Sequence, residues 1–250
     1  MMRLYKTDAL VLRVRDFSEA DRIVTLYTYS RGKVQAIAKG SRKTKSRKRG
    51  AVQPFTYGNF LLYQGRSLDT ITQCEPKESF SHLREDLVKL AYSTYLTELV
   101  DGFTAEGEPN EQVFLLLLTT FYLLLKDNPG LLVRAFELKL LNILGYCPQL
   151  ESCVHCHGPV AGNAAKVRFS SRLGGVLCDE CSGHDPFATT IQMGSLKTMQ
   201  QLLKWDIRRL QVLKVPEERQ QEIAAILRHY IDERIERKLK STVFLDTVLQ

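Results

Sequence analysis

Residues 22–39, RIVTLYTYSRGKVQAIAK, decide the fold of the N-terminal part of the chain. Two short runs rich in Val, Ile, Thr and Tyr flank Ser30, Arg31 and Gly32, and this order predicts a β-hairpin with a tight turn. Polar and apolar residues alternate only in part along the first run. Such incomplete alternation is compatible with a strand of a small barrel.

Three further runs of the same kind make the first 80 residues a predicted β-domain. The five predicted strands cover residues 4–14, 22–28, 33–39, 54–63 and 68–74. Five short strands in roughly 75 residues suit a small closed barrel such as the OB-fold. An SH3-like barrel fits the number of strands almost as well, so the strand pattern alone leaves both open.

From about residue 81 the hydrophobic period changes to that of a helix. The predicted helices cover about residues 83–103, 110–125, 131–144, 195–204 and 216–240. We therefore expect an α+β protein of several domains: a barrel at 1–80, a mostly helical domain formed by 81–145 and 188–250, and an insertion at 146–187. The N-terminus lacks the features of a signal peptide and no apolar stretch reaches the ~20 residues of a bilayer span, which predicts a cytoplasmic protein without a membrane partner.

Positive charge is concentrated near the N-terminus. The 250 residues contain 35 Lys and Arg against 28 Asp and Glu, a formal net charge of +7, but residues 1–80 alone carry 16 cations and seven acids. Residues 39–50, KGSRKTKSRKRG, are the densest part and contain no apolar side chain, so they predict a flexible loop. Clustered cations displace counterions from DNA or RNA, which favours phosphate contact over a solvated loop that only aids solubility.

Four of the six cysteines form two pairs, Cys153-Val154-His155-Cys156 and Cys178-Asp179-Glu180-Cys181. Two such pairs complete a tetrahedral zinc site, and four thiolates leave no open position, so the predicted zinc is structural. The intervening residues suggest a short hairpin, as in zinc ribbons. Two disulfides are disfavoured in a reducing cytosol, whereas His155, His157 or His184 as a replacement for one cysteine stays open.

No catalytic motif stands out in the rest of the sequence. It contains no glycine-rich phosphate loop with a lysine, no Gly-x-Ser-x-Gly and no His-Glu-x-x-His, so we expect a binding protein rather than an enzyme, with no small-molecule substrate. Three rival functions stay open. They are a zinc-ribbon factor that binds RNA or promoters, a thiol-disulfide oxidoreductase that uses the paired cysteines, and a metal-dependent nuclease, for which the sequence offers no evident carboxylate cluster.

Several motifs occur in an order that resembles one known family. They are residues 18–28 (SEADRIVTLYT), Gly32-Lys33, Ala38-Lys39-Gly40, residues 43–47, Leu144-Gly145-Tyr146 before the cysteine pairs, and Arg237-Lys238-Leu239-Lys240-Ser241. Over nearly its whole length, the chain resembles the RecO family of bacterial recombination mediators.

The resemblance implies a function in DNA repair and recombination. It implies an OB-fold followed by a helical domain that carries a zinc finger. It also implies binding to single- and double-stranded DNA, annealing of complementary strands and, with RecR, loading of RecA onto coated single strands. RecR and the single-stranded-DNA-binding protein are the implied partners, and the nucleoid is the implied place of action.

Charge pattern and resemblance together single out candidate DNA contacts. Phosphate contacts are expected from Lys33, Lys39, Arg42, Lys43, Lys45, Arg47, Lys48 and Arg49. Base stacking is expected from Tyr27, Tyr29 and Tyr57, whereas most other aromatic residues of this segment belong to the predicted core. A second basic patch consists of Lys204, Arg208, Arg209, Arg237, Lys238 and Lys240. This patch extends the DNA track, seats an acidic partner tail, or is a solvated helix end.

Overall fold

The computed structural model describes residues 4–126, 129–160 and 165–249. The chain divides into two compact units. The first combines the residues up to Leu125 with those from Leu239 onward, and the second is Lys126–Lys238. The helices expected to form one domain are thus divided between two units, because the helices of residues 81–125 and the last helix of the chain belong to the first unit.

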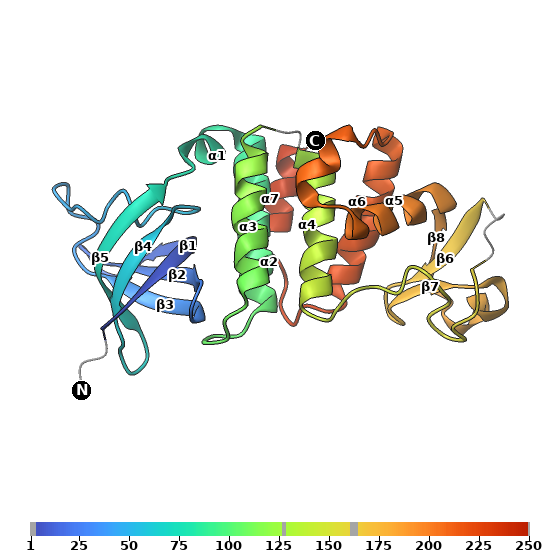
Figure 1. Cartoon of the computed structure of the whole chain (residues 1–250), viewed down its shortest axis with the longest axis horizontal. Coiled ribbons are helices and arrows are strands. Elements are labelled where there is room, and N and C mark those ends of the chain that lie inside the picture. The colour runs from blue at the N-terminus through green and yellow to red at the C-terminus, as the bar shows by residue number, and fades with distance from the viewer. Residues whose placement is uncertain (1–3, 127–128, 161–164, 250) are drawn as a thin grey trace. The chain divides into compact units, whose positions relative to one another are not determined.

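Five strands form a closed barrel at the start of the first unit (Figure 1). They are β1 (Leu4–Asp16), β2 (Arg22–Thr28), β3 (Gly32–Ala38), β4 (Tyr57–Tyr63) and β5 (Asp69–Glu78). The strand order is β1-β2-β3-β5-β4, and antiparallel pairing of β1 with β4 closes the barrel. Because β3 runs parallel to β5, the barrel is no all-antiparallel meander. The fold is the predicted OB-fold, and the SH3-like alternative is wrong.

Side chains of alternate strand residues fill the barrel. The core includes Ala9, Val11, Val24, Leu26, Ala36, Phe60, Leu62 and Ile71, all inaccessible to solvent. Residues that point outward from β2 are buried as well, which explains the incomplete alternation in the sequence. Ile23 is 4%, Thr25 3% and Tyr27 0% exposed.

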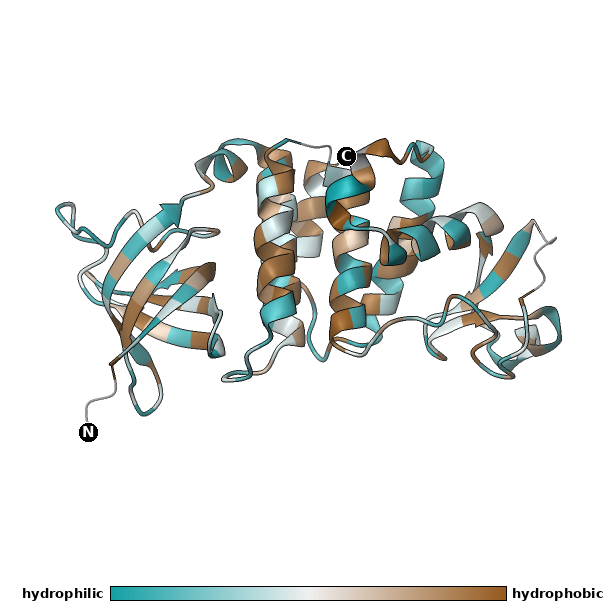
Figure 2. Ribbon diagram, viewed as in Figure 1, coloured by the Kyte–Doolittle hydropathy of each residue, from teal (hydrophilic) through white to brown (hydrophobic). Residues whose placement is uncertain are grey.

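Among the residues that the structure describes, four helices complete the first unit. They are α1 (Ser81–Glu85), α2 (Leu87–Phe103), α3 (Glu111–Leu124) and α7 (Ser241–Val248). The predicted first helix is interrupted at Asp86, whose carboxylate accepts hydrogen bonds from the amides of Val88 and Lys89 and so starts α2. Asn110 caps α3 as predicted. In Figure 2, α3 is coloured largely brown, as its leucine-rich sequence requires.

The barrel and the helices of the first unit are joined by aromatic contacts. Phe55, just before β4, and Phe80, just before α1, both pack edge to face on Phe121 of α3, with ring centroids 5.6 and 5.5 Å away. At the other end of the chain, the amides of Lys240 and Ser241 donate to the Glu98 carboxylate of α2 at 3.0 and 2.7 Å. These bonds hold the start of α7 beside α2 (Figure 1).

The second unit combines helices with a small sheet. Its elements are α4 (Pro129–Ile143), β6 (Lys166–Ser170), β7 (Gly175–Leu177), the 3-10 helix η1 (Asp179–His184), β8 (Thr189–Gln192), α5 (Met193–Lys204), the 3-10 helix η2 (Ile207–Val212) and α6 (Glu217–Asp232). The sheet order is β7-β6-β8. Gly145 ends α4 in the left-handed conformation (φ 80°), with hydrogen bonds from Gly145 to Asn142 and from Tyr146 to Leu141.

The helix predicted over residues 216–240 is shorter than expected. Helix α6 ends at Asp232, and Arg234 beyond it donates to the Ser171 carbonyl at 2.6 Å. Ile235 and Leu239 are buried as the periodicity required, but they lie in the irregular segment after the helix. Among the described residues, no helix has the length and apolar character to cross a lipid bilayer.

Candidate nucleic-acid interface and metal centre

The basic loop, residues 39–50, connects β3 toward β4 as a series of consecutive turns. Backbone hydrogen bonds join Lys43 to Gly40, Ser46 to Lys43 and Arg49 to Ser46 at 3.0–3.2 Å. The loop is fixed at its start because the Gly40 amide donates to the Asp21 carboxylate at 2.8 Å. It is fixed at its end because Val52 belongs to the barrel core. The turns therefore hold the loop's cations on an anchored backbone.

Five cations of the basic loop are exposed, and within the described ranges none has a hydrogen-bond or carboxylate partner for its side chain. They are Lys39, Lys43, Lys45, Arg47 and Arg49. Unpaired like charges repel one another, so their cluster is stabilised by solvent or by a polyanion. We call these five side chains the free cations of the loop.

The other three candidate phosphate contacts are engaged within the protein. Lys33 donates from Nζ to the Asp101 carbonyl at 2.6 Å and lies 3.4 Å from the Asp101 carboxylate, with only 12% of its side chain exposed. Lys33 thus joins β3 to α2 and is not one of the exposed cations of this surface. Arg42 pairs with Asp16 at 3.5 Å. Half-buried Lys48 donates to the Ile71 carbonyl at 2.6 Å.

The three candidate stacking tyrosines do not gather at the basic loop. Stacking by Tyr27 is wrong, because its side chain is fully buried and burial raises the pKa of its hydroxyl to about 12. Tyr29 is exposed, and its ring and that of Tyr57 both pack on Phe114 of α3. Tyr29 lies at one end of β2, and the basic loop starts near the other end. The seven residues of β2 place the two ends roughly 20 Å apart.

The second basic patch is largely neutralised or dispersed. Lys204 pairs with Glu151 at 2.8 Å, and Arg208 pairs with Asp206 at 2.6 Å, which holds the pKa of Asp206 well below its usual range. Arg209 is exposed. Arg237 and Lys238 end the second unit, whereas Lys240 directly precedes α7 in the first, so the six residues do not form one surface within either unit.

The four cysteines of the predicted metal site come together. Cys153 and Cys156 lie in a turn before the β6–β7 hairpin, Cys178 follows β7, and Cys181 lies in η1. Their sulfur atoms are within 4.8 Å of one another, and Sγ of Cys156 is 3.7 Å from Sγ of Cys178. Sulfurs of a tetrahedral zinc site with Zn–S bonds of about 2.3 Å are about 3.8 Å apart. The donor set and its spacing therefore fit a metal ion.

The pKa values of these thiols also fit a cation bound between the sulfurs. Burial opposes ionisation of Cys153, but nearby backbone amides donate to its sulfur and lower the pKa of the thiol to about 6. Burial and the neighbouring sulfurs raise the pKa of Cys181 to about 12. Both residues also belong to a small core with Leu177 and Ala188. Four thiolates this close together require a positive charge between them.

His155 and His184 lie beside the sulfur cluster. Nδ1 of His155 is 3.7 Å from Sγ of Cys181, and the two imidazole rings are 3.8 Å apart. Together with Cys181 they offer a second group of ligand atoms within 4.8 Å of one another. Both histidines are exposed, whereas Cys153 and Cys181 are buried. The four-cysteine set therefore has two buried ligands, whereas the group with the two histidines has one.

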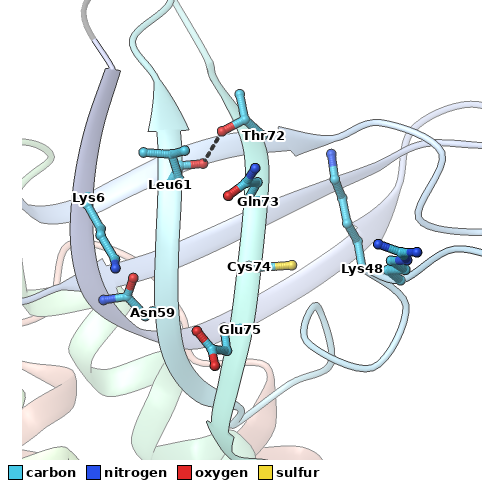
Figure 3. Close-up of a pocket in the computed structure, with 9 residues that line it drawn as sticks. Lys6, Lys48, Asn59, Leu61, Thr72, Gln73, Cys74 and Glu75 are labelled. Carbon is cyan, nitrogen blue, oxygen red and sulfur yellow. Dashed lines mark hydrogen bonds between the residues drawn. The ribbon is translucent and has the colours of Figure 1, made fainter.

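A polar groove of about 590 Å³ on the barrel had no clear signal in the sequence (Figure 3). Its lining residues are Lys6, Arg47, Lys48, Asn59, Leu61, Thr72, Gln73, Cys74 and Glu75. The pairing of β4 with β5 shifts between Leu61 and Leu62, and this bulge leaves Thr72 and Gln73 both exposed. Figure 3 shows the Cys74 sulfur directed toward Lys48. In the sequence these polar residues are single positions on exposed strands, and no pattern indicated that they line one groove.

Comparisons with known proteins identify the family. The model described as Recombination protein O N terminal matches residues 2–80, and that described as Recombination protein O C terminal matches residues 84–242. The chain belongs to the RecO family. DNA repair protein RecO of Pelotomaculum thermopropionicum is 48% identical over 245 residues, which cover 98% of this chain and 94% of that protein. DNA repair protein RecO of Symbiobacterium thermophilum is 46% identical over 249 residues, 99% of this chain and 98% of that protein.

The RecO assignment accounts for the order of the observed parts. The first family model ends at residue 80, just after the last strand of the barrel, and the second covers helices α2 to α6 and the cysteine cluster. Membership in the RecO family makes this a DNA repair protein, so the resemblance drawn from the sequence motifs is confirmed. The fold, an OB barrel followed by helices and a four-cysteine element, is confirmed with it.

Proposed function

We propose that this protein binds single- and double-stranded DNA through the basic loop and anneals complementary strands. The observation that carries the proposal is the set of five free cations on an anchored loop of an OB barrel. Clustered cations without carboxylate partners attract polyphosphates and release their counterions. Membership in a DNA repair family supports DNA as the polyanion.

Annealing by such a surface needs no catalytic group. Two strands repel each other through their phosphates, and cations bound to both strands reduce that repulsion. Contacts to phosphates position a strand but leave the base edges free to pair. A non-enzymatic mediator therefore suffices for this step. The protein should anneal complementary DNA strands of any base sequence.

The protein partners of this activity follow from the same proposal. We propose that, with RecR, the protein acts on single strands coated by the single-stranded-DNA-binding protein and helps to load RecA. Action on chromosomal DNA would take place at the nucleoid in the cytoplasm. The support is the family membership and the DNA-binding surface proposed above.

We propose that the ion held by the four cysteines is zinc and that its role is structural. Cys153, Cys156, Cys178 and Cys181 would hold it through their sulfurs. With four protein ligands the ion has no open position for water or substrate, so it supplies no catalytic chemistry. Its effect would be to join the two turns on either side of the β6–β7 hairpin.

The experiment that tests the proposed function measures annealing of complementary oligonucleotides by a loop variant. The variant carries Lys43→Gln, Lys45→Gln, Arg47→Gln and Arg49→Gln, and we expect it to lose most of the annealing rate. The control removes four exposed cations outside the barrel, at Lys126, Lys166, Lys197 and Lys214. Equal annealing by the loop variant and the wild type would contradict the proposal, as would a preference for RNA over DNA in a parallel binding assay.

A further inference from the structure

The face that OB-folds commonly use for nucleic acids is covered in this protein. That face is formed by strands 2 and 3 together with the loops at their ends. Here the outward residues of β2, Ile23, Thr25 and Tyr27, are at most 4% exposed. On β3, the Gln35 amide donates a hydrogen bond to the Glu106 carboxylate. The Lys33 carbonyl accepts a hydrogen bond from the Gly107 amide at 3.0 Å. A strand of DNA would therefore have to bind to another face of the barrel.

The exposed alternative is the polar groove over β4 and β5 (Figure 3). Lys6 of β1 and Arg47 and Lys48 of the basic loop supply three cations to its lining, against one acid, Glu75. Arg47 is at the same time one of the free cations of the loop. The groove therefore continues the positive surface of the loop onto the sheet.

The groove contains amide and hydroxyl groups but no aromatic ring. Asn59, Thr72 and Gln73 are the neutral polar side chains of its lining. Amides and hydroxyls bind phosphate and sugar oxygens, whereas bases are usually held by stacking on aromatic rings. The lining thus offers cations and hydrogen bonds to the backbone of a strand and has no ring on which a base could stack.

We propose that this groove, next to the basic loop, binds the sugar-phosphate backbone of a single polynucleotide strand and leaves the bases directed away from the protein. The proposal rests on the proposed function and specifies the face of the barrel that performs it. It explains how a bound strand stays able to pair with its complement. It also requires that affinity be independent of base sequence.

The test measures the affinity of the full-length protein for an oligothymidylate at 50 mM salt, with charge changes of both signs in the groove. Gln73→Glu adds a negative charge and should weaken binding about fivefold. Glu75→Gln removes one and should tighten binding, also about fivefold, a gain that damage to the fold does not produce. Gln64→Glu and Glu108→Gln make the same charge changes at exposed positions outside the groove and should alter affinity less than twofold.

Occupancy of the groove can be read without a substitution. Cys74 lines the groove, whereas Cys147 lies in the second unit; both are half-buried, and burial raises the pKa of both thiols. Oligothymidylate should slow alkylation of Cys74 and leave that of Cys147 unchanged, and oligoadenylate should do the same.

The outcomes separate this inference from the proposed function. If oligothymidylate binds and the loop variant loses binding, but the groove variants match their controls and Cys74 reacts at its free rate, the groove proposal is wrong and the loop alone binds. If no oligonucleotide binds, both proposals fail. A strong preference between oligothymidylate and oligoadenylate would overturn the backbone-only mode of contact.

Discussion

Lys33 of β3 and Asp101 of α2 form a largely buried ion pair, with Nζ of Lys33 2.6 Å from the Asp101 carbonyl and 3.4 Å from its carboxylate. The two side chains are 12% and 9% exposed. The pair joins the barrel to the helix that follows it, 68 residues later in the sequence. A cation that the charge pattern assigned to DNA is thus part of the internal structure of the first unit.

Replacement of Lys33 should therefore lower stability and leave DNA affinity nearly unchanged. Lys33→Met keeps the apolar stem but leaves the Asp101 carboxylate without this cation, which should cost about 3 kcal/mol in the free energy of unfolding. Chemical denaturation measures that energy. Lys45→Met is the matched control, because Lys45 is exposed and should affect DNA affinity and not stability. The reverse pattern would restore Lys33 to the DNA contacts.

Loss of one zinc ligand should unfold the cysteine element before it affects anything else. Cys178→Ser should abolish stoichiometric zinc, measured by mass spectrometry of the native protein, and should increase amide exchange in residues 146–160 and 165–187. The physical reason is that Cys153 and Cys181 supply half of the four buried residues in that core. Cys147→Ser serves as the control and should keep the metal. A metal-free Cys178→Ser protein with wild-type protection would contradict a structural role.

Two glycines with positive φ should respond very differently to alanine. At Gly32 (φ 62°) an added Cβ would lie 1.9 Å from the Glu108 carbonyl oxygen, so Gly32→Ala should separate the β2–β3 turn from the segment after α2 and cost about 3 kcal/mol or more. At Gly145 (φ 80°) the Cβ meets nothing within 4 Å, and only the backbone strain of about 1 kcal/mol remains. Denaturation curves of the two variants decide the matter, and equal losses would refute this account.

The elements that depend on local pattern could be predicted from the sequence. Strand β2 has the predicted limits. Asn110 begins α3 and Gly145 ends α4, as expected. Each cysteine pair has the Cys-x-x-Cys spacing of a metal site, so the convergence of the two pairs was predictable as well.

The roles that depend on contacts between distant segments could not be predicted. Tyr27 and Lys33 lie in a strand pattern that looks the same whether or not α2 and the segment after it contact these strands. The bulge at Thr72 changes which side chains of β5 point outward, and no residue type announces it. The buried stripe of α6 continues past Asp232 although the helix does not, because an irregular segment can bury apolar residues at the same spacing.

The salt dependence of DNA affinity tests the central claim most directly. With the five free cations of the loop on a single strand, the logarithm of the association constant for an oligothymidylate should fall with the logarithm of salt concentration at a slope of about −3.5 or steeper. Glutamine at Lys43, Lys45, Arg47 and Arg49 should make this slope shallower by about 2.8, because each removed cation contributes about 0.7. Equal slopes for the two proteins, or a wild-type affinity that does not respond to salt, would contradict the claim that the basic loop holds DNA by its phosphates.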